Sequence, residues 1–169
     1  MKKLNLGCGK RILKGYVNCD IQNGDGIDNS FDFNVFPYPY LSNYFDYVYC
    51  DNVLEHLDNV NEVLKELWRI SKPNAKIRII VPYWNAVSAY NDSTHKHWFN
   101  ERTFEILCGI NHVYSHSVNR TFNLKIKFIP NKAFKFLPQY LLRLVGHYIC
   151  NVISALDVEL EVIKNDRNP

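Results

Sequence analysis

A short apolar run near the N-terminus ends abruptly in two glycines separated by one residue, Leu4-Asn5-Leu6-Gly7-Cys8-Gly9. Such a run is typical of a buried strand, and the glycines indicate a sharp turn at its end. Because glycine has no side chain, Gly7 and Gly9 permit dihedrals that other residues avoid, and a ligand can lie against the bare backbone. The stretch predicts a strand followed by a ligand-binding turn, although a glycine turn without a ligand fits the same residues.

A second apolar run, Tyr16-Val17-Asn18-Cys19, ends in Asp20, eleven residues after Gly9. A carboxylate at the carboxyl end of a second parallel strand is placed to accept hydrogen bonds from ribose hydroxyls. Dinucleotide-binding turns carry a third glycine, but Ile12 stands at that position, so a pyrophosphate ligand is disfavoured. The residues between Gly9 and Val17 are too few for an ordinary crossover helix, and we expect a single helical turn or an irregular loop.

The composition excludes several other classes of protein. The chain has 169 residues, enough for one domain with a full core, and a mild net charge of +3 without a dense run of Lys or Arg. There is thus no clear nucleic-acid signature. The five scattered cysteines indicate reduced thiols rather than a disulfide framework or a zinc site. With no secretory signal pattern after Met1, we expect a cytoplasmic protein.

The rest of the first half alternates predicted strands with connections, which is typical of a parallel sheet. We expect strands at residues 3–6, 16–19, 31–34, 45–50 and 77–81. Asp58 is the expected N-cap of a helix that ends near residue 70. Its predicted core face is formed by apolar residues at helical spacing: Val60, Val63, Leu64, Leu67 and Ile70. Asn74 is expected to take a left-handed conformation in the turn that follows.

The second half predicts a helix capped by Asn100, and then two strands at residues 121–128 and 157–164, where apolar residues alternate with polar ones. We expect these strands to pair antiparallel, with Lys125 and Lys127 opposite or diagonal to Glu159 and Glu161. Between them, residues 132–156 form a predicted helical insertion. Its apolar arc over residues 137–156 indicates a lid, or else a surface for a homodimer or a membrane interface. Its polar content argues against a membrane-spanning helix.

Two stretches resemble motifs of the class I S-adenosylmethionine-dependent methyltransferases, in particular the small single-domain members. The segment Asn5-Leu6-Gly7-Cys8-Gly9 resembles their first motif, and Leu54-Glu55-His56-Leu57 resembles the motif that follows their fourth strand. The second half is similar more loosely, chiefly around Thr94-His95-Lys96. The resemblance implies one α/β domain over residues 1–169. Its Rossmann-like, doubly wound sheet would be mostly parallel with an antiparallel last strand, in three α/β/α layers.

The same resemblance implies S-adenosylmethionine as the cofactor, bound across the strand ends. Gly7 and Gly9 would approach its methionine part, and Asp20 its ribose. Asp32 and Phe33 would lie at its adenine, although Asp32 also fits a turn-capping acid. The remaining expected cofactor contacts are Asn5, which replaces an acid found in many relatives, Cys8, Ile21, Cys50 and Asp51.

Methyl transfer needs the acceptor and the methyl group in line at about 3–3.5 Å, and a base helps when the acceptor is a hydroxyl. His95 is the first candidate for that base, and His56 is the second. His95 and His97 also fit a surface loop in which they only pack or form hydrogen bonds. No Cys, Asp or Glu at a familiar spacing completes a ligand set with His95 and His97, so we expect no metal site.

The implied function is methyl transfer from S-adenosylmethionine to an O or N atom of a small-molecule or glycan acceptor that the sequence does not identify. The alternative is a catalytically degenerate S-adenosylmethionine-binding module that acts as a regulator or scaffold. A nicotinamide-dependent reductase is disfavoured by Ile12. We expect a monomer, or a homodimer if the apolar arc of the insertion contacts a second subunit.

Overall fold

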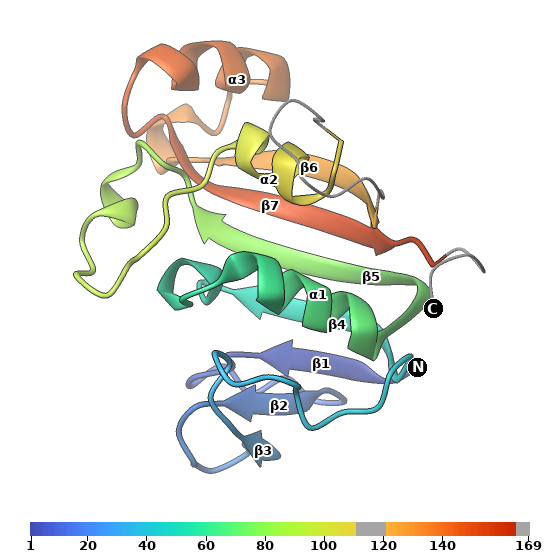
Figure 1. The fold of residues 1–169 in the computed structure, drawn as a ribbon. Coiled ribbons are helices and arrows are strands. Elements are labelled where there is room, and N and C mark those ends of the chain that lie inside the picture. The colour runs from blue at the N-terminus through green and yellow to red at the C-terminus, as the bar shows by residue number, and fades with distance from the viewer. Residues whose placement is uncertain (111–120, 165–169) are drawn as a thin grey trace.

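The computed structural model describes residues 1–110 and 121–164, which form a seven-stranded sheet in the order β3-β2-β1-β4-β5-β7-β6 (Figure 1). The strands are β1 Lys3–Leu6, β2 Val17–Asp20, β3 Asn29–Ser30, β4 Phe45–Asp51, β5 Ser71–Pro82, β6 Phe122–Pro130 and β7 Ile153–Val162. β7 runs antiparallel to both of its neighbours, β5 and β6, and the pairs among β1 to β5 are parallel. The predicted α/β class, mostly parallel with an antiparallel last strand, is confirmed.

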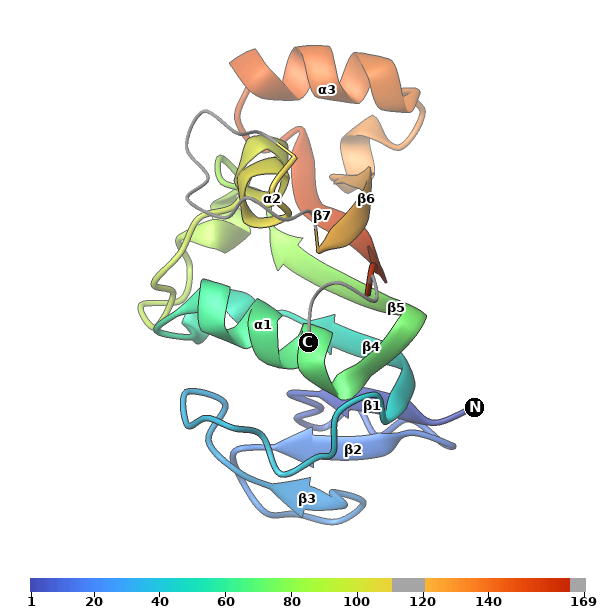
Figure 2. The same ribbon diagram turned by 45° about the vertical axis from the view of Figure 1, so that its right-hand side comes forward.

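The helices are α1 Val60–Ile70, α2 Glu101–Leu107 and α3 Gln139–Tyr148, with 3-10 turns at Leu54–His56, Val87–Ala89 and Lys132–Phe134. α1 and α2 lie on the same face of the sheet (Figures 1 and 2). Between β1 and β4 the chain forms turns and loops instead of helices, as the short connection after Gly9 predicted. The third layer of the expected α/β/α arrangement is therefore reduced. On the opposite face, the guanidinium groups of Arg11 and Arg78 lie 5.3 and 5.9 Å from the ring centre of Tyr49.

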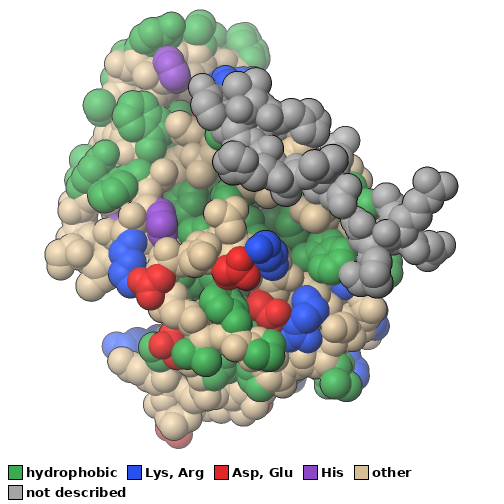
Figure 3. Space-filling model, in the orientation of Figure 1, with side chains coloured by type: hydrophobic (Ala, Val, Ile, Leu, Met, Phe, Trp, Pro, Cys, Tyr) green, Lys and Arg blue, Asp and Glu red, His purple; other side chains and the backbone are tan. Residues whose placement is uncertain are grey.

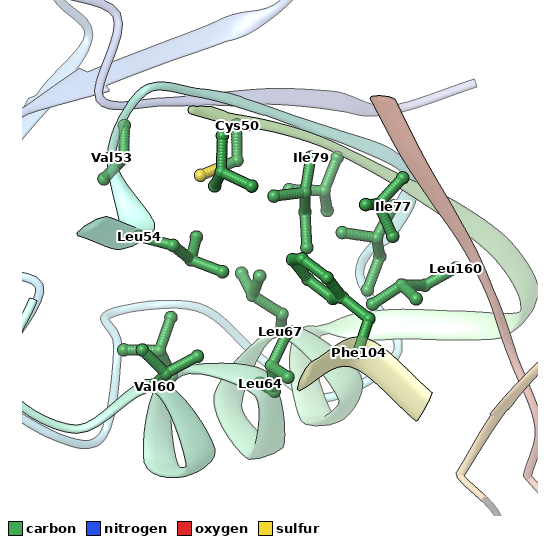
Figure 4. Close-up of a cluster of buried hydrophobic side chains, with 14 of the residues drawn as sticks. Cys50, Val53, Leu54, Val60, Leu64, Leu67, Ile77, Ile79, Phe104 and Leu160 are labelled. Atoms are coloured by element: carbon green, nitrogen blue, oxygen red, sulfur yellow. The ribbon is translucent and has the colours of Figure 1, made fainter. Parts of the chain in front are cut away.

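The core lies between the sheet and α1, and it follows directly from the spacing of apolar residues. The five predicted core positions of α1 are all buried: Val60, Val63, Leu64, Leu67 and Ile70. Phe104 of α2 reaches the same core, where it meets Leu67 of α1 and Ile77 of β5 (Figure 4). All five cysteines are free thiols, and four of them are buried, as their scattered spacing predicted.

The predicted strand at residues 31–34 is wrong, because β3 ends at Ser30 and the chain then leaves the sheet. Phe31 packs edge-on against Phe33 and Tyr38 with ring centres 5.0 and 5.2 Å apart. Arg69 of α1 donates to the carbonyl oxygen of Tyr38 at 3.0 Å, which fixes the loop against the helix. The aromatic side chains thus cover the sheet where a helix would otherwise pack, and Pro37 and Pro39 keep this loop out of regular structure.

The helix ends match their predicted residues with one exception. Asn59, not Asp58, caps α1 by accepting from the backbone N–H of Glu62 at 3.2 Å. The N-cap must lie directly before the first helical residue, and Asp58 instead pairs with Lys96. Asn74 has the expected left-handed φ of 63°, but it lies within β5, which begins at Ser71 and not at the predicted residue 77. Asn100 forms the predicted cap of α2, completed by Thr103 as a capping box.

The insertion lies between β6 and β7 as predicted, but Ile153 already belongs to β7, so the predicted end at residue 156 is too late. Lys125 lies opposite Glu159, whereas Lys127 faces Asp157 and Glu161 faces Asn123. Hydrophobic side chains gather on the surface over α3 (Figure 3). The large exposed ones in this part are Phe136, Tyr140, Leu144, Tyr148 and Ile149. Among the described residues, the helices are all too short or too polar to cross a bilayer.

Candidate functional site

Four parallel strands, β1, β2, β4 and β5, end at one edge of the sheet (Figure 1). Gly7 follows β1 directly, while Asp20 and Asp51 are the last residues of β2 and β4. Ligands of open parallel sheets bind at this edge, because loops and strand ends leave polar groups there unpaired. The topology therefore brings together residues that the sequence analysis assigned to one cofactor site.

The glycine turn is fixed to the end of β2. Gly7 and Gly9 have φ values of 70° and 48°, in the left-handed region that glycine adopts without strain. The backbone N–H of Gly9 donates to Oδ2 of Asp20 at 2.7 Å, and the N–H of Gln22 donates to Oδ1 at 3.2 Å. A side chain added at Gly9 would meet no atom within 4 Å. The turn thus leaves open space beside a half-buried carboxylate, which fits an amino-acid group next to a ribose.

Asn5 supports this turn from below and does not face the open space. Its side chain is buried, and its Nδ2 donates to the carbonyl oxygen of Arg11 at 2.8 Å and to Oδ1 of Asn18 at 2.9 Å. Asn18 Oδ1 also accepts from the N–H of Leu13 at 2.9 Å. The buried amide pair thereby holds the loop that replaces a crossover helix. Both bonds use the side-chain amide nitrogen of Asn5, so this nitrogen supports the loop and is not free to contact the cofactor.

Asp51 is held by an arginine that the sequence analysis did not single out. Oδ2 of Asp51 accepts from Nη1 of Arg11 and from the hydroxyl of Tyr49, both at 2.7 Å. Cys8 and Cys50 are buried, and burial raises the pKa of both thiols, so neither is a reactive thiolate. A ligand at this edge would meet the backbone of the two cysteines and the carboxylate of Asp51.

The residues predicted to surround adenine differ in their exposure. Phe33 is buried among the other aromatic rings of its loop, so its ring face is not available to a ligand. Asp32 is exposed, and its Oδ1 accepts from the N–H of Asn34 at 2.8 Å, which is the turn-capping role left open by the sequence. Ile21 is 61% exposed next to Asp20 and offers an apolar surface on which a planar base can pack.

A second group of side chains forms where the loops after β4 and β5 meet. Glu55 and His56 lie in the 3-10 turn after β4, and His95 lies in the loop after β5. One potential metal-ligand atom from each of the three residues lies within 4.8 Å of the others. The rings of His56 and His95 meet edge to face, with centres 4.7 Å apart. The two histidines proposed as bases thus come together, with a carboxylate that the sequence analysis had not assigned.

Backbone contacts fix this group in place. The N–H of Lys96 donates to the carbonyl oxygen of Glu55 at 2.7 Å, and the ammonium of Lys96 pairs with Asp58. His97 donates from Nε2 to the carbonyl oxygen of Leu57 at 2.8 Å, so this histidine holds the two loops together. The loop role that the sequence left open for both histidines therefore describes His97, and the ring of His95 lies with Glu55.

Glu55 is the unusual member of this group. Glu55 is only 1% exposed, and neither of its carboxylate oxygens has a hydrogen-bond partner among the described residues. Burial raises the pKa of Glu55 to about 7, opposed by its own backbone N–H and by His95. A buried carboxylate without a partner is costly, and such groups cluster at functional sites. Its sequence signal was its place in Leu54-Glu55-His56-Leu57, where only the histidine was given a role.

A pocket of about 610 Å³ opens beyond the end of β5, between α2 and α3. Its walls are aromatic and charged and include Trp84, Arg102, Tyr140, Arg143 and Tyr148. The N–H of Trp84 donates to the carbonyl oxygen of Phe99 at 2.9 Å, and Phe99 follows His97 by two residues. The loop that carries His95 therefore runs from the carboxylate group to the pocket wall.

Comparisons with known proteins found a matching family model and several similar folds. Residues 4–79 match the model of the methyltransferase domain family. A SAM dependent methyltransferase from Archaeoglobus fulgidus shares the fold with a TM-score of 0.68 at 17% identity, covering 95% of this chain and 85% of that one. Phosphoethanolamine N-methyltransferase 2 from Haemonchus contortus, in complex with S-adenosyl-L-methionine, has a TM-score of 0.61 at 14% identity. That match covers 98% of this chain and 49% of the other.

A third similar structure is a putative methyltransferase in complex with the Trm112 methyltransferase activator of Haloferax volcanii. It has a TM-score of 0.63 at 13% identity and covers 96% of this chain and 83% of that chain. No curated protein sequence matches this chain.

The strand order and the carboxyl-edge site define a Rossmann-like fold of the methyltransferase type. The match to the methyltransferase domain model spans β1 through most of β5, so the chain is similar to S-adenosylmethionine-dependent methyltransferases over this part of the fold. The family's cofactor is S-adenosylmethionine, and the open turn beside Asp20 fits it.

Proposed function

We propose that this chain transfers a methyl group from S-adenosylmethionine to an O or N atom of a small-molecule or glycan acceptor. The observation that carries the proposal is the meeting of two sites at one edge of the sheet. The open glycine turn beside Asp20 suits the cofactor. The group of Glu55, His56 and His95 suits the acceptor side.

The cofactor-side residues divide into those that bind and those that support. Gly9 and Asp20 would lie against the amino-acid and ribose parts, and Ile21 would pack on adenine. Asn5 and Arg11 hold the turn and the end of β4 in place. When bound, S-adenosylmethionine supplies an activated methyl group, and the chain has to position the acceptor in line with it.

His95 is oriented for proton transfer. Its Nδ1 lies 2.9 Å from the carbonyl oxygen of Ala89. A carbonyl only accepts, so Nδ1 carries the proton and Nε2 keeps a free lone pair. Nε2 can therefore accept the proton of an acceptor hydroxyl as the methyl group is transferred.

The pocket between α2 and α3 is the proposed entry for the acceptor. Trp84, Tyr140 and Tyr148 offer ring faces, and Arg102 and Arg143 offer charged donors. Such a mixed lining suits a polar molecule with apolar faces, as sugars have. Because α3 forms one wall, we assign it as a lid; its exposed apolar side chains leave dimer or membrane contact as other roles. The free thiols suit the reducing cytoplasm.

The first test is calorimetric titration of the purified chain with S-adenosylmethionine and S-adenosylhomocysteine. Binding of both supports the cofactor site, and transfer of a labelled methyl group to a component of a cell lysate supports the enzyme. Binding without any methyl transfer across lysates and defined sugars or amines favours the binding module instead. Absence of binding contradicts the proposal at its first step.

Asp20→Ala is expected to weaken S-adenosylmethionine binding about 10–100-fold, because a hydrogen bond to a charged group contributes about 1.5–3 kcal/mol. Asp20→Asn is the matched variant, since its amide oxygen still accepts from the N–H of Gly9 while the charge is lost. Calorimetry of both variants separates two contributions to the affinity, the ordering of the glycine turn by Asp20 and the contact of its charge with ribose. Unchanged affinity in Asp20→Ala would show that the ribose lies elsewhere.

His95→Ala is expected to leave S-adenosylmethionine binding within about twofold and to lower methyl transfer about 100-fold or more, the usual contribution of a general base. His97→Ala is the comparison, because it loses the bond to Leu57 and should lower the melting temperature. If His95→Ala lowers only the melting temperature, His95 is a packing residue and the base is another group.

A further inference from the structure

Three potential ligand groups from two loops converge, and among the described residues the carboxylate oxygens of Glu55 have no hydrogen-bond partner. One potential ligand atom from each of Glu55, His56 and His95 lies within 4.8 Å of the others. We propose that these three residues bind a divalent transition-metal ion, with Zn²⁺ as the test ion, and leave a coordination position for an oxygen of the acceptor. The inference deepens the proposed function and rests on it only for the identity of that last ligand.

The first argument is the protonation state of the two rings. His95 Nδ1 donates to the carbonyl oxygen of Ala89 at 2.9 Å, so its Nε2 lone pair is free. His56 Nδ1 lies 2.9 Å from the hydroxyl of Thr94. That hydroxyl lies 2.7 Å from Oδ1 of Asp92 and donates its proton to this carboxylate. His56 must then donate from Nδ1 to Thr94, which leaves its Nε2 lone pair free as well.

Metal-binding histidines are fixed in this way in proteins. The nitrogen away from the metal donates to a carbonyl or a carboxylate, which sets the ring orientation and makes the other nitrogen a better ligand. Here Ala89 plays that role for His95, and the pair of Thr94 and Asp92 plays it for His56. The outer contacts of a metal site are thus present around both rings.

The second argument is the carboxylate. Glu55 is 1% exposed, and neither of its oxygens has a hydrogen-bond partner in the part of the chain that the structure describes. Burial of a charged group without a partner is unfavourable, and a metal ion is one of the partners that offset it. A carboxylate with two free oxygens, fixed beside two free imidazole nitrogens, can bind a cation.

The chemistry of the set selects the kind of ion. Two imidazoles and one carboxylate favour Zn²⁺ and the other late divalent ions over Mg²⁺ or Ca²⁺, which prefer oxygen ligands. Three protein ligands leave a tetrahedral ion one open position, as in catalytic rather than structural zinc sites. An acceptor hydroxyl at this position would ionise more readily and release its proton to solvent water, so the metal would replace proton removal by His95.

The sequence analysis missed this set because it looked for a third ligand near His95 and His97. The carboxylate comes from Glu55, 40 residues before His95, and His97 is occupied by its bond to Leu57. The hydrogen bond from the N–H of Lys96 to the carbonyl of Glu55 brings the two loops together.

The test uses the full chain without a histidine tag, treated with EDTA, in a Cys150→Ser background, because the thiol of Cys150 is exposed and thiols are zinc ligands. Calorimetry with Zn²⁺ alone should show one site, and Co²⁺ should give the visible absorption of a bound ion. Glu55→Gln, His56→Gln and His95→Gln should each weaken Zn²⁺ about 100-fold or more, since even outer contacts contribute about 10–100-fold.

Two further variants make the test specific. Thr94→Val removes only the outer contact of His56 and should weaken Zn²⁺ about 10–100-fold. His147→Gln changes an exposed histidine on α3 and should leave the affinity unchanged. Absence of Zn²⁺ and Co²⁺ binding, or binding that the three ligand variants do not weaken, overturns the proposal.

The same three acceptors would also suit a protonated amine, so methylammonium is titrated in parallel. Tight binding of methylammonium in place of Zn²⁺ assigns the set to an amine acceptor and overturns the metal site. S-adenosylmethionine is titrated separately into the metal-free chain. Its binding without metal binding would refute the metal site and leave the methyltransferase intact, whereas the reverse result would refute the proposed function and keep the metal site.

Discussion

Gly7→Ala is expected to lower the free energy of unfolding by about 2–5 kcal/mol. An added Cβ at Gly7 would lie 2.2 Å from Cγ2 of Val53, which is closer than two carbon atoms can approach. Crowding of this kind costs about 1–3 kcal/mol, and the left-handed φ of 70° adds about 1–2 kcal/mol for any residue with a side chain. Urea denaturation of the purified variant measures the sum.

Gly9→Ala is the matched control, because Gly9 is also left-handed, with a φ of 48°, but faces open space. It should cost only the backbone part, about 1–2 kcal/mol. The larger effect of Gly9→Ala should appear in S-adenosylmethionine binding. The side chain of the introduced alanine would occupy the space where the cofactor is proposed to lie. If Gly9→Ala binds the cofactor as tightly as the unchanged chain, the glycine turn is not the cofactor site.

The double variant Gly7→Ala with Val53→Ala tests the cause of the first effect. Val53→Ala removes the two γ carbons that the new Cβ would strike, at the cost of buried apolar surface. The two substitutions should therefore show a coupling of about 1 kcal/mol or more in a double-mutant cycle. Simple additivity would mean that the destabilisation comes from the backbone alone, and that β1 and the loop after β4 are not in close contact.

Most of the sheet could be predicted from the sequence because its strands are short apolar runs with clear ends. A glycine, Gly7, and an acid, Asp20, follow the apolar runs of β1 and β2 and mark where these strands end. The core face of α1 is evident from the helical spacing of its apolar residues. The antiparallel strands β6 and β7 alternate with period two. In each case the local pattern and the tertiary structure agree, and prediction from a single sequence works under that condition.

The loop after β3 could not be predicted in the same way. Phe31 and Phe33 alternate with acid and amide residues, as in a strand, yet they pack against Tyr38 and α1. Their aromatic partners lie in the same loop, which Arg69 of α1 holds through the carbonyl oxygen of Tyr38, and pairing of this kind has no period in the sequence. The high aromatic content could be read from the sequence. That these rings cover the sheet in place of a helix could not be predicted from it.

The sequence assigned glycines and acids to the candidate site, but it did not assign the central carboxylate, Glu55. Asp20 lies next to the turn that it was assigned to, through its bond from the N–H of Gly9. Asn5 and Phe33 have structural partners that only the fold reveals. Glu55 stood in a recognised motif but received no role, because its lack of a hydrogen-bond partner among the described residues cannot be read from a sequence.

Glu55→Gln is expected to remove a large pH dependence of stability from the metal-free chain. Burial raises the pKa of Glu55 to about 7 from its ordinary value of 4.5. Among the charged groups that face it, His95 lowers the pKa, and Asp51 and Asp92 raise it further. Between these pH values the folded chain binds a proton that the unfolded chain has lost, so stability falls as the pH rises.

The sign and the size of the effect follow from this difference. The unfolded state binds fewer protons, so the free energy of unfolding declines from about pH 4.5 to about pH 7 and is then constant with respect to this group. A shift of this size corresponds to about 3 kcal/mol, at 1.36 kcal/mol per pKa unit. Glu55→Gln keeps the shape of the side chain and cannot ionise, so its stability curve should lack this decline.

The measurement is urea denaturation in EDTA at several values between about pH 5 and about pH 8. The difference between the unchanged chain and Glu55→Gln should grow by about 3 kcal/mol in favour of the variant over that range. Glu62→Gln is the control, because Glu62 is an exposed residue of α1 that pairs with Lys65, and its curve should parallel that of the unchanged chain. Parallel curves for Glu55→Gln as well would mean that the carboxylate is solvated or already paired in solution.

The same variant should lose methyl transfer while it gains stability at neutral pH. Residues that are unfavourable for folding persist where function requires them, and their replacement stabilises a protein at the cost of activity. A chain that became more stable at pH 8 and kept full activity would show that Glu55 is a defect of the fold with no part in the reaction. Gain of stability with loss of turnover would show that the buried carboxylate is unfavourable for folding and is required for the reaction at the strand ends.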